Sequence, residues 1–128
     1  MSGDLPPGVI VPEVDFEVER LTMVVLYEGP RRCEYSDEDA QRLANEHVHY
    51  VIGLARDGAV LHAGTVIDAD PKAPLTGIAF SRLSHDELRP LIANDPAVVA
   101  GMESFKLVTH GFRKGGLAFP QTDVLAAG

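Results

Sequence analysis

The chain is poor in cysteine, in aromatic residues and in positive charge. Cys33 is the only cysteine, and there is no tryptophan. A single thiol excludes a disulfide within the chain and makes a reducing compartment the simpler expectation. The formal net charge is −8, which argues against a general nucleic-acid binder because phosphate contacts require clustered lysine and arginine.

Long apolar runs are also absent. No stretch approaches the length of a membrane span, and the amino terminus lacks the basic-then-apolar pattern of a secretion signal. We therefore expect a cytoplasmic protein with no membrane contact. Its 128 residues, of which 45% are hydrophobic and 23% charged, allow one globular domain with a single core.

Turn and cap residues divide the chain into alternating elements. Ser36 and Ser84 are each followed by acidic residues, the pattern of a helix start in which a hydroxyl caps the first turn. Apolar and β-branched runs predict strands between the helices. We expect strands at 21–27, 59–63, 76–81 and 103–113, helices at 37–56 and from 85 to about 94, and a further turn at 97–100.

The ends of the chain look different from its middle. Residues 1–20, with several prolines and acids, predict an extended arm. Residues 21–114 form the predicted domain, and residues 115–128 a tail.

The element order β-α-β-β-α-β is that of the ferredoxin-like split unit, an α+β fold. Two helices then cover one face of a four-stranded antiparallel sheet, and the other face is left apolar. Pairing of two such faces would bury them, so we expect a homodimer formed through the sheet.

His47 is the most informative residue because it lies in the apolar stripe of the first helix. The stripe recurs at three- and four-residue steps, the period of one helical face, through Ala40, Leu43, Ala44, Val48, Val51, Leu54 and Ala55. An imidazole turned toward a core needs hydrogen-bond partners. Asp95, in the run Asn94-Asp95-Pro96, is the best candidate for that partner.

Two interpretations of this pair stay open. In the first, Asp95 holds one ring nitrogen of His47 while the other nitrogen takes or gives a proton, as in general acid–base catalysis. In the second, Asp95 caps a turn before Pro96, and His47 is a hydrogen-bonded histidine of the core.

Three further residues are candidate substrate contacts: Tyr27 at the end of the first strand, Tyr50 one turn after His47, and His62 on the second strand. Tyrosines at such positions also serve as rim or interface residues. We expect no metal ion and no other cofactor. His47 and His49 are two apart on a helix, and neither a His-x-x-x-His motif nor a cysteine pair supplies the convergent ligands of a zinc site.

With the elements in this order, three segments resemble the YCII-related family of small dimeric α+β barrel proteins. They are the spacing from His47 to Gly58-Ala59-Val60-Leu61-His62-Ala63-Gly64, the run Asn94-Asp95-Pro96-Ala97-Val98-Val99-Ala100-Gly101, and the strand Phe105-Lys106-Leu107-Val108-Thr109-His110-Gly111-Phe112. The resemblance covers roughly residues 21–114 as a pattern match. The chain departs from it at Ala44, where many members have a basic residue, and at Thr65, where many have proline.

The resemblance implies a ferredoxin-like protomer, a dimer formed through the sheets, and an active site containing His47 and Asp95. The related superfamily includes lactone isomerases, a dehydrochlorinase of a hydroxylated ring, and monooxygenases that need no metal. The leading hypothesis is cofactor-independent isomerisation, elimination or cyclisation of a hydrophobic cyclic or aromatic metabolite. The alternatives are a non-catalytic ligand-binding or accessory subunit and a cofactor-free monooxygenase.

Overall fold

The computed structural model describes residues 8–119. The four strands are β1 (Val18–Glu28), β2 (His62–Thr65), β3 (Leu75–Ser81) and β4 (Glu103–Arg113). The helices are the short 3₁₀ helix η1 (Arg32–Glu34), α1 (Asp37–Arg56), α2 (His85–Ala93) and α3 (Pro96–Val99). Within this part of the chain, no helix has the length and apolar character needed to cross a membrane.

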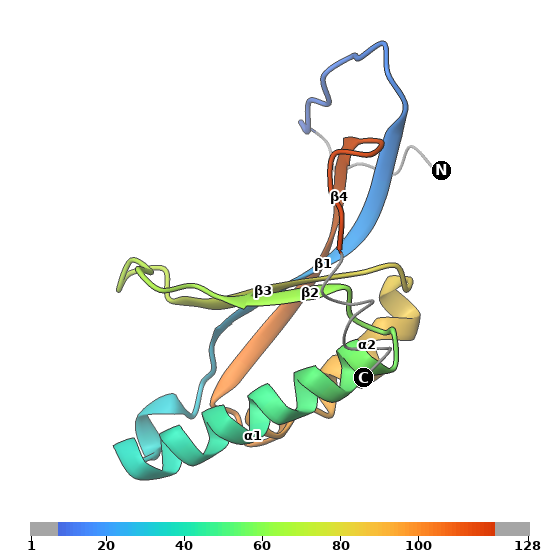
Figure 1. Cartoon of the computed structure of the whole chain (residues 1–128). Helices are drawn as coiled ribbons and strands as arrows, with labels where there is room; N and C mark the ends of the chain where they lie inside the picture. The colour runs from blue at the N-terminus through green and yellow to red at the C-terminus, as the bar shows by residue number, and fades with distance from the viewer. Residues whose placement is uncertain (1–7, 120–128) are drawn as a thin grey trace.

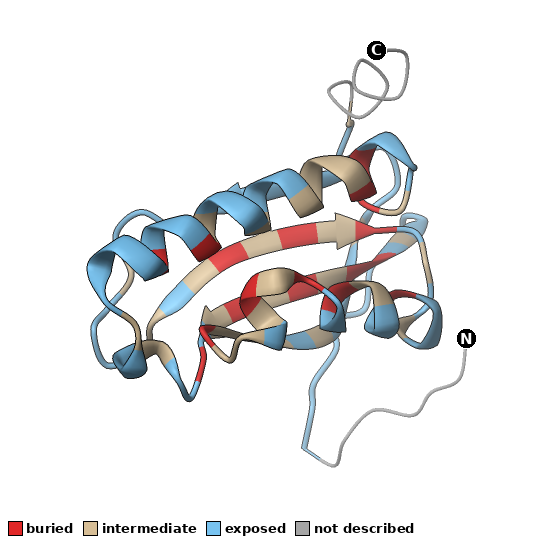
Figure 2. Ribbon diagram, turned by 90° about the horizontal axis from the view of Figure 1, so that it is seen from below, coloured by how far each residue is buried: buried red, intermediate tan, exposed pale blue. Residues whose placement is uncertain are grey.

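The strands form one antiparallel sheet in the order β2-β3-β1-β4. This order and the β-α-β-β-α-β connectivity confirm the predicted ferredoxin-like α+β fold. The helices lie on one face of the sheet, and β1 and β4 run on past β3 as a two-stranded ribbon (Figures 1 and 2).

The predicted helix starts are confirmed. The Ser36 side chain accepts a hydrogen bond from the Asp39 amide at 3.1 Å. Ser84 and Glu87 form a capping box, in which each side chain bonds the other residue's amide. Helix α2 continues through Pro90 and ends where Asn94 and Asp95 lead into α3.

Two strands differ from the prediction by more than one residue. β1 begins at Val18, because Val18 pairs with Arg113 of β4, so the last three residues of the predicted arm belong to the sheet. β2 was expected at 59–63 and lies at His62–Thr65. The amides of Ala59 and Val60 instead donate to the Leu54 carbonyl at the end of α1, which holds this segment against the helix.

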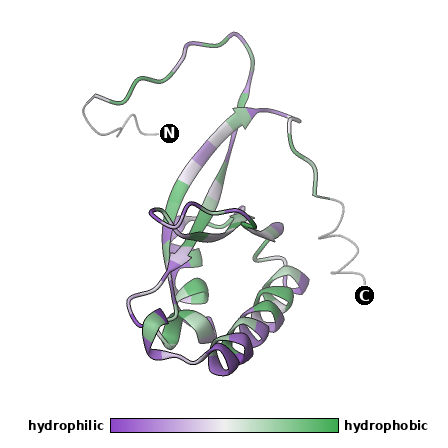
Figure 3. Ribbon diagram, turned by 90° about the vertical axis from the view of Figure 1, so that its left-hand side faces the viewer, coloured by the Kyte–Doolittle hydropathy of each residue, from purple (hydrophilic) through white to green (hydrophobic). Residues whose placement is uncertain are grey.

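Two groups of buried side chains hold the helices against the sheet. The main cluster consists of Val24, Leu26, Leu54, Val60, Ala79, Leu88 and Ile92. A smaller cluster consists of Ala40, Leu43, Ala97 and Met102. Helix α1 contributes to both, near its start and near its end, and its hydrophilic residues gather on the outward side (Figure 3).

The face of the sheet opposite the helices carries a row of large side chains. Met23 of β1 lies between Phe80 of β3 and Val108 of β4 in the register. The rings of Phe80 and His110 are 5.7 Å apart, and Phe112 stacks on His110 at 5.6 Å. In the single chain, this open face is only partly covered.

Candidate active site

The middle of α1 borders a cavity rather than the core. The helix is packed at Ala40 and Leu43 and again at Leu54, but Val48, in the middle of the same stripe, is 51% exposed. The predicted apolar stripe is therefore real, but its central part lines a hollow between α1 and the β2–β3 side of the sheet.

This cavity has a volume of about 270 Å³. Most of its wall is apolar, and among the residues that line it only His47, His62 and Asp95 are ionisable. The full lining is Val24, Leu26, His47, Val48, Val51, Ile52, Leu54, Ala55, Val60, Leu61, His62, Ala63, Gly64, Thr65, Ile78, Ala79, Ile92 and Asp95.

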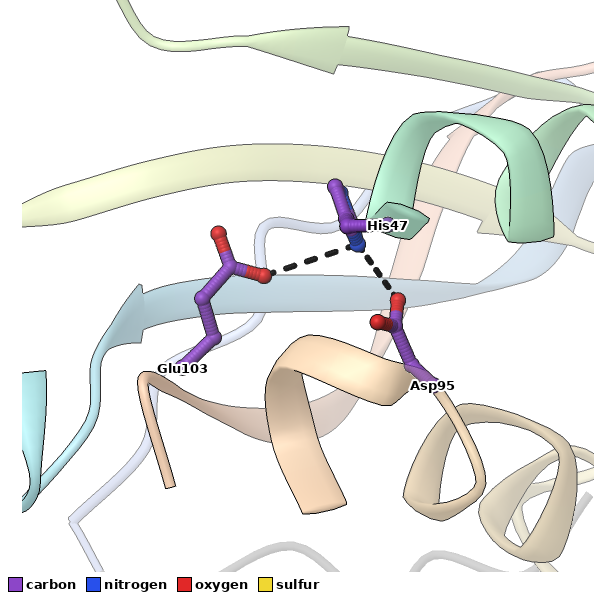
Figure 4. A group of neighbouring side chains, drawn as sticks. All are labelled: His47, Asp95 and Glu103. Carbon is purple, nitrogen blue, oxygen red and sulfur yellow. Dashed lines mark hydrogen bonds and ion pairs between the residues drawn. The ribbon is translucent and has the colours of Figure 1, made fainter. Parts of the chain in front are cut away.

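His47 and Asp95 meet at the wall of the cavity. His47 Nδ1 and Asp95 Oδ2 form a short, direct hydrogen bond (Figure 4). The other carboxylate oxygen, Oδ1, accepts the Ala97 amide at 2.9 Å and so caps α3. One carboxylate therefore both caps the turn before Pro96 and bonds the imidazole.

Glu103 completes the cluster, and the sequence prediction missed it. Its Oε2 lies 3.6 Å from His47 Nδ1, and the side chain is 12% exposed. Among the residues that the structure describes, this buried oxygen has no hydrogen-bond partner. A signal was present: Glu103 is two residues before Phe105, so strand alternation places it on the same face as Phe105 and Leu107.

The electrostatics of the cluster favour bound protons. Burial by itself lowers the pKa of His47, but the hydrogen bond to Asp95 and the charges of Glu103 and Asp95 outweigh it, so the pKa is raised above 6.5. Burial raises the pKa of Glu103 above 4.5, and the Asp95 charge adds to this. The His47 charge and the neighbouring Thr76 hydroxyl oppose the shift of Glu103 without cancelling it.

The three side chains also have the donor atoms of a metal site, since their ligand atoms all lie within 4.8 Å of one another. They come from α1, the α2–α3 turn and the start of β4, so no motif along the chain could reveal them. In the observed arrangement, however, Nδ1 is already bonded directly to Asp95. An ion bound by this nitrogen would compete with the proton that links it to Asp95.

The other predicted contacts do not join this cluster. Tyr27 lies on the open face of the sheet, with the Lys106 ammonium 5.8 Å from its ring. The Tyr50 hydroxyl donates to the Leu91 carbonyl at 2.8 Å. His62 borders the cavity, but it pairs with Phe80 in the sheet, so alternation turns its side chain toward the open face.

No protein-family model matches the sequence, and no curated protein matches it. Among solved structures, the chain is similar to TftG, the 5-chloro-2-hydroxyhydroquinone dehydrochlorinase of Burkholderia phenoliruptrix AC1100, in complex with 2,5-dihydroxybenzoquinone. The identity is 18%, the match covers 70% of this chain and 90% of that chain, and the TM-score is 0.49. The fold assignment therefore rests on the sheet order and connectivity described above.

Proposed function

We propose that the cavity binds a small, largely apolar cyclic or aromatic metabolite and that His47 and Asp95 move a proton on it without a cofactor. The observation that carries the proposal is the hydrogen bond from Asp95 that orients His47 at the wall of an apolar cavity. An oriented imidazole beside a hydrophobic pocket is the arrangement that general acid–base catalysis requires.

The size and lining of the cavity support this class of ligand. A dry cavity of roughly 150 Å³ is enough to bind benzene, and this one has about 270 Å³. Apolar walls favour a ring, and the few polar groups of the lining fix its orientation.

The roles of the two residues follow from their contacts. Asp95 accepts a hydrogen bond from the Nδ1–H group of His47 and so sets the tautomer and the orientation of the ring. The second nitrogen, Nε2, has no partner among the described residues. It is the atom that would take a proton from the ligand. The proton would return at another position in an isomerisation or cyclisation and would pass to the leaving group or to solvent in an elimination.

Proton transfer is tested by exchange with solvent. Uncharged cyclic ketones, lactones and phenols would be incubated with the protein in deuterated buffer that contains EDTA, and deuterium incorporation followed by NMR. We expect His47→Ala to lower the exchange or turnover rate by about 10²–10⁴-fold. His49→Ala is the matched control because His49 is an exposed histidine on the same helix.

Equal rates for His47→Ala and the wild type would contradict the proposal. A ligand that binds and is recovered unchanged, with an affinity insensitive to Asp95→Asn, would instead favour a non-catalytic ligand-binding or accessory subunit. Oxygen consumption during turnover would point to a cofactor-free monooxygenase.

We further propose that the chain is a cytoplasmic, YCII-related protein and that two copies pair through the open faces of their sheets. The three motif segments support the family assignment. The row formed by Phe80, Met23 and Val108 supports the dimer, because it is an apolar surface that a second copy would bury.

A further inference from the structure

The cluster of His47, Asp95 and Glu103 carries a negative charge, and no lysine or arginine among residues 8–119 lines the cavity to balance it. Asp95 and Glu103 both approach Nδ1 of His47. A neutral imidazole already carries one proton. With one additional proton bound to either His47 or Glu103, the cluster of His47, Asp95 and Glu103 has a charge of −1. This holds whether an imidazolium lies beside two carboxylates or a neutral ring lies beside one carboxylate and one carboxylic acid.

No lysine or arginine lines the cavity among the residues that the structure describes. Arg31 pairs with Glu34 and Arg42 with Glu46 at the surface, and Arg32 lines a separate pocket with Ala40 and Met102. Lys106 lies over Tyr27 on the open face of the sheet. His62, the remaining ionisable residue of the lining, turns its side chain toward that same face.

We infer that the site selects uncharged ligands over anionic ones and that Glu103 is the residue that sets this specificity. The inference rests on the proposed function, since it names the charge class of the ligand that the same cavity takes. Carboxylates and phosphates are excluded, and neutral ring compounds with a hydroxyl, carbonyl or amide oxygen are accepted.

Glu103 acts at a distance and does not touch the ligand. An anion bonded to Nε2 would lie on the order of 8 Å from the Glu103 carboxylate, since the ring and one hydrogen bond separate them. At that distance, an unbalanced charge near a protein surface, reduced by solvent and salt, still changes affinity by about tenfold.

The test compares two probes of nearly equal shape, 4-hydroxybenzamide and 4-hydroxybenzoate. Dissociation constants would be measured by NMR at about pH 6, where histidine is mostly protonated, in buffer with EDTA so that no divalent ion neutralises the carboxylates. We expect the wild type to bind the amide at least about tenfold more tightly than the carboxylate. Glu103→Gln should reduce this ratio by about tenfold, through tighter binding of the carboxylate.

Glu46→Gln is the matched control. It removes the same charge beside His47 in sequence, but from the exposed side of α1, and should leave the ratio unchanged. Should Glu103→Gln not fold, the wild type alone decides: repulsion is screened by salt, so the ratio should shrink between about 0.02 and 0.5 M salt.

The inference fails if the wild type binds both probes equally, or if neither Glu103→Gln nor salt changes the ratio. These results would leave the proposed proton transfer standing. If neither probe and no other uncharged ring binds, the proposed function fails, and the inference fails with it.

Discussion

At the residue scale, the site depends on one buried carboxylate with two tasks. Asp95 orients His47 through Oδ2 and caps α3 through Oδ1. A single side chain therefore joins the chemistry of the site to the folding of the turn that follows α2.

Asp95→Ala should lower the free energy of unfolding by about 2–4 kcal/mol, because the half-buried His47 imidazole and the buried Ala97 amide both lose their partner. Urea denaturation monitored by circular dichroism measures this change. Asp86→Ala, which removes an exposed carboxylate from the first turn of α2, should cost less than about 1 kcal/mol. A similar cost for the two variants would show that the buried contacts contribute little.

The raised pKa values of His47 and Glu103 make stability depend on pH. Both groups bind protons more tightly in the folded chain than in the unfolded chain, so the free energy of unfolding should fall as the pH rises. The His47 contribution is complete below its ordinary pKa of 6.5 and is lost as the pH rises through its raised value. Glu103 acts in the same direction from 4.5 upward.

Urea unfolding at several pH values from about 6 to 8.5 should therefore show that the free energy of unfolding falls more steeply for the wild type than for His47→Gln. The glutamine at position 47 does not titrate, and the other histidines are the same in both proteins. Parallel curves, or a wild type that becomes more stable as the pH rises, would contradict the assignment.

At the scale of elements, two glycines show how backbone packing places the site. Gly29 follows β1, and its amide donates to the Met102 carbonyl at 2.8 Å, next to Glu103. A Cβ at Gly29 would lie only 2.3 Å from the Gly101 carbonyl oxygen, whereas a Cβ at Gly53, inside α1, would meet nothing within 4 Å.

Alanine at these two positions should have opposite effects. Gly53→Ala should stabilise the protein by about 0.5–1 kcal/mol, because a helix interior favours alanine. Gly29→Ala should destabilise it by at least about 2 kcal/mol, because backbone must move. Thermal unfolding of both variants and of the wild type measures these changes in stability. A neutral Gly29→Ala would mean that the β1–η1 turn relaxes freely.

At the scale of the whole molecule, the proposed dimer depends on the open face of the sheet. If two copies bury this face, light scattering should give twice the monomer mass. Val108→Asp would place a charge at the β4 end of the row and should yield monomers. Ile67→Asp is the control because Ile67 is 94% exposed on the β2–β3 loop. A wild type that is monomeric at high concentration would exclude the proposed dimer.

Most of the fold could be predicted from local patterns. The start of α1 follows from the Ser36 cap, and the bounds of β4 follow from the approximate alternation of its side chains. Both signals act over a few residues. The β2 boundary could not be predicted in this way. The amides of Ala59 and Val60 donate hydrogen bonds to the Leu54 carbonyl, so these residues do not pair in the sheet and the strand begins later. The pairing of His47 with Asp95 was predictable because an imidazole in an apolar stripe requires a partner.

The sequence by itself determined the order of elements, the caps and the presence of a histidine that must be paired, since these depend on near neighbours and on helical or strand periodicity. Only the tertiary structure decided that Glu103 joins the pair and that the middle of α1 faces a cavity. It also decided that Tyr27 and His62 turn toward the open face. Those outcomes depend on the strand register and on where a helix is separated from the sheet by a cavity. Both are set by contacts between segments far apart in the chain.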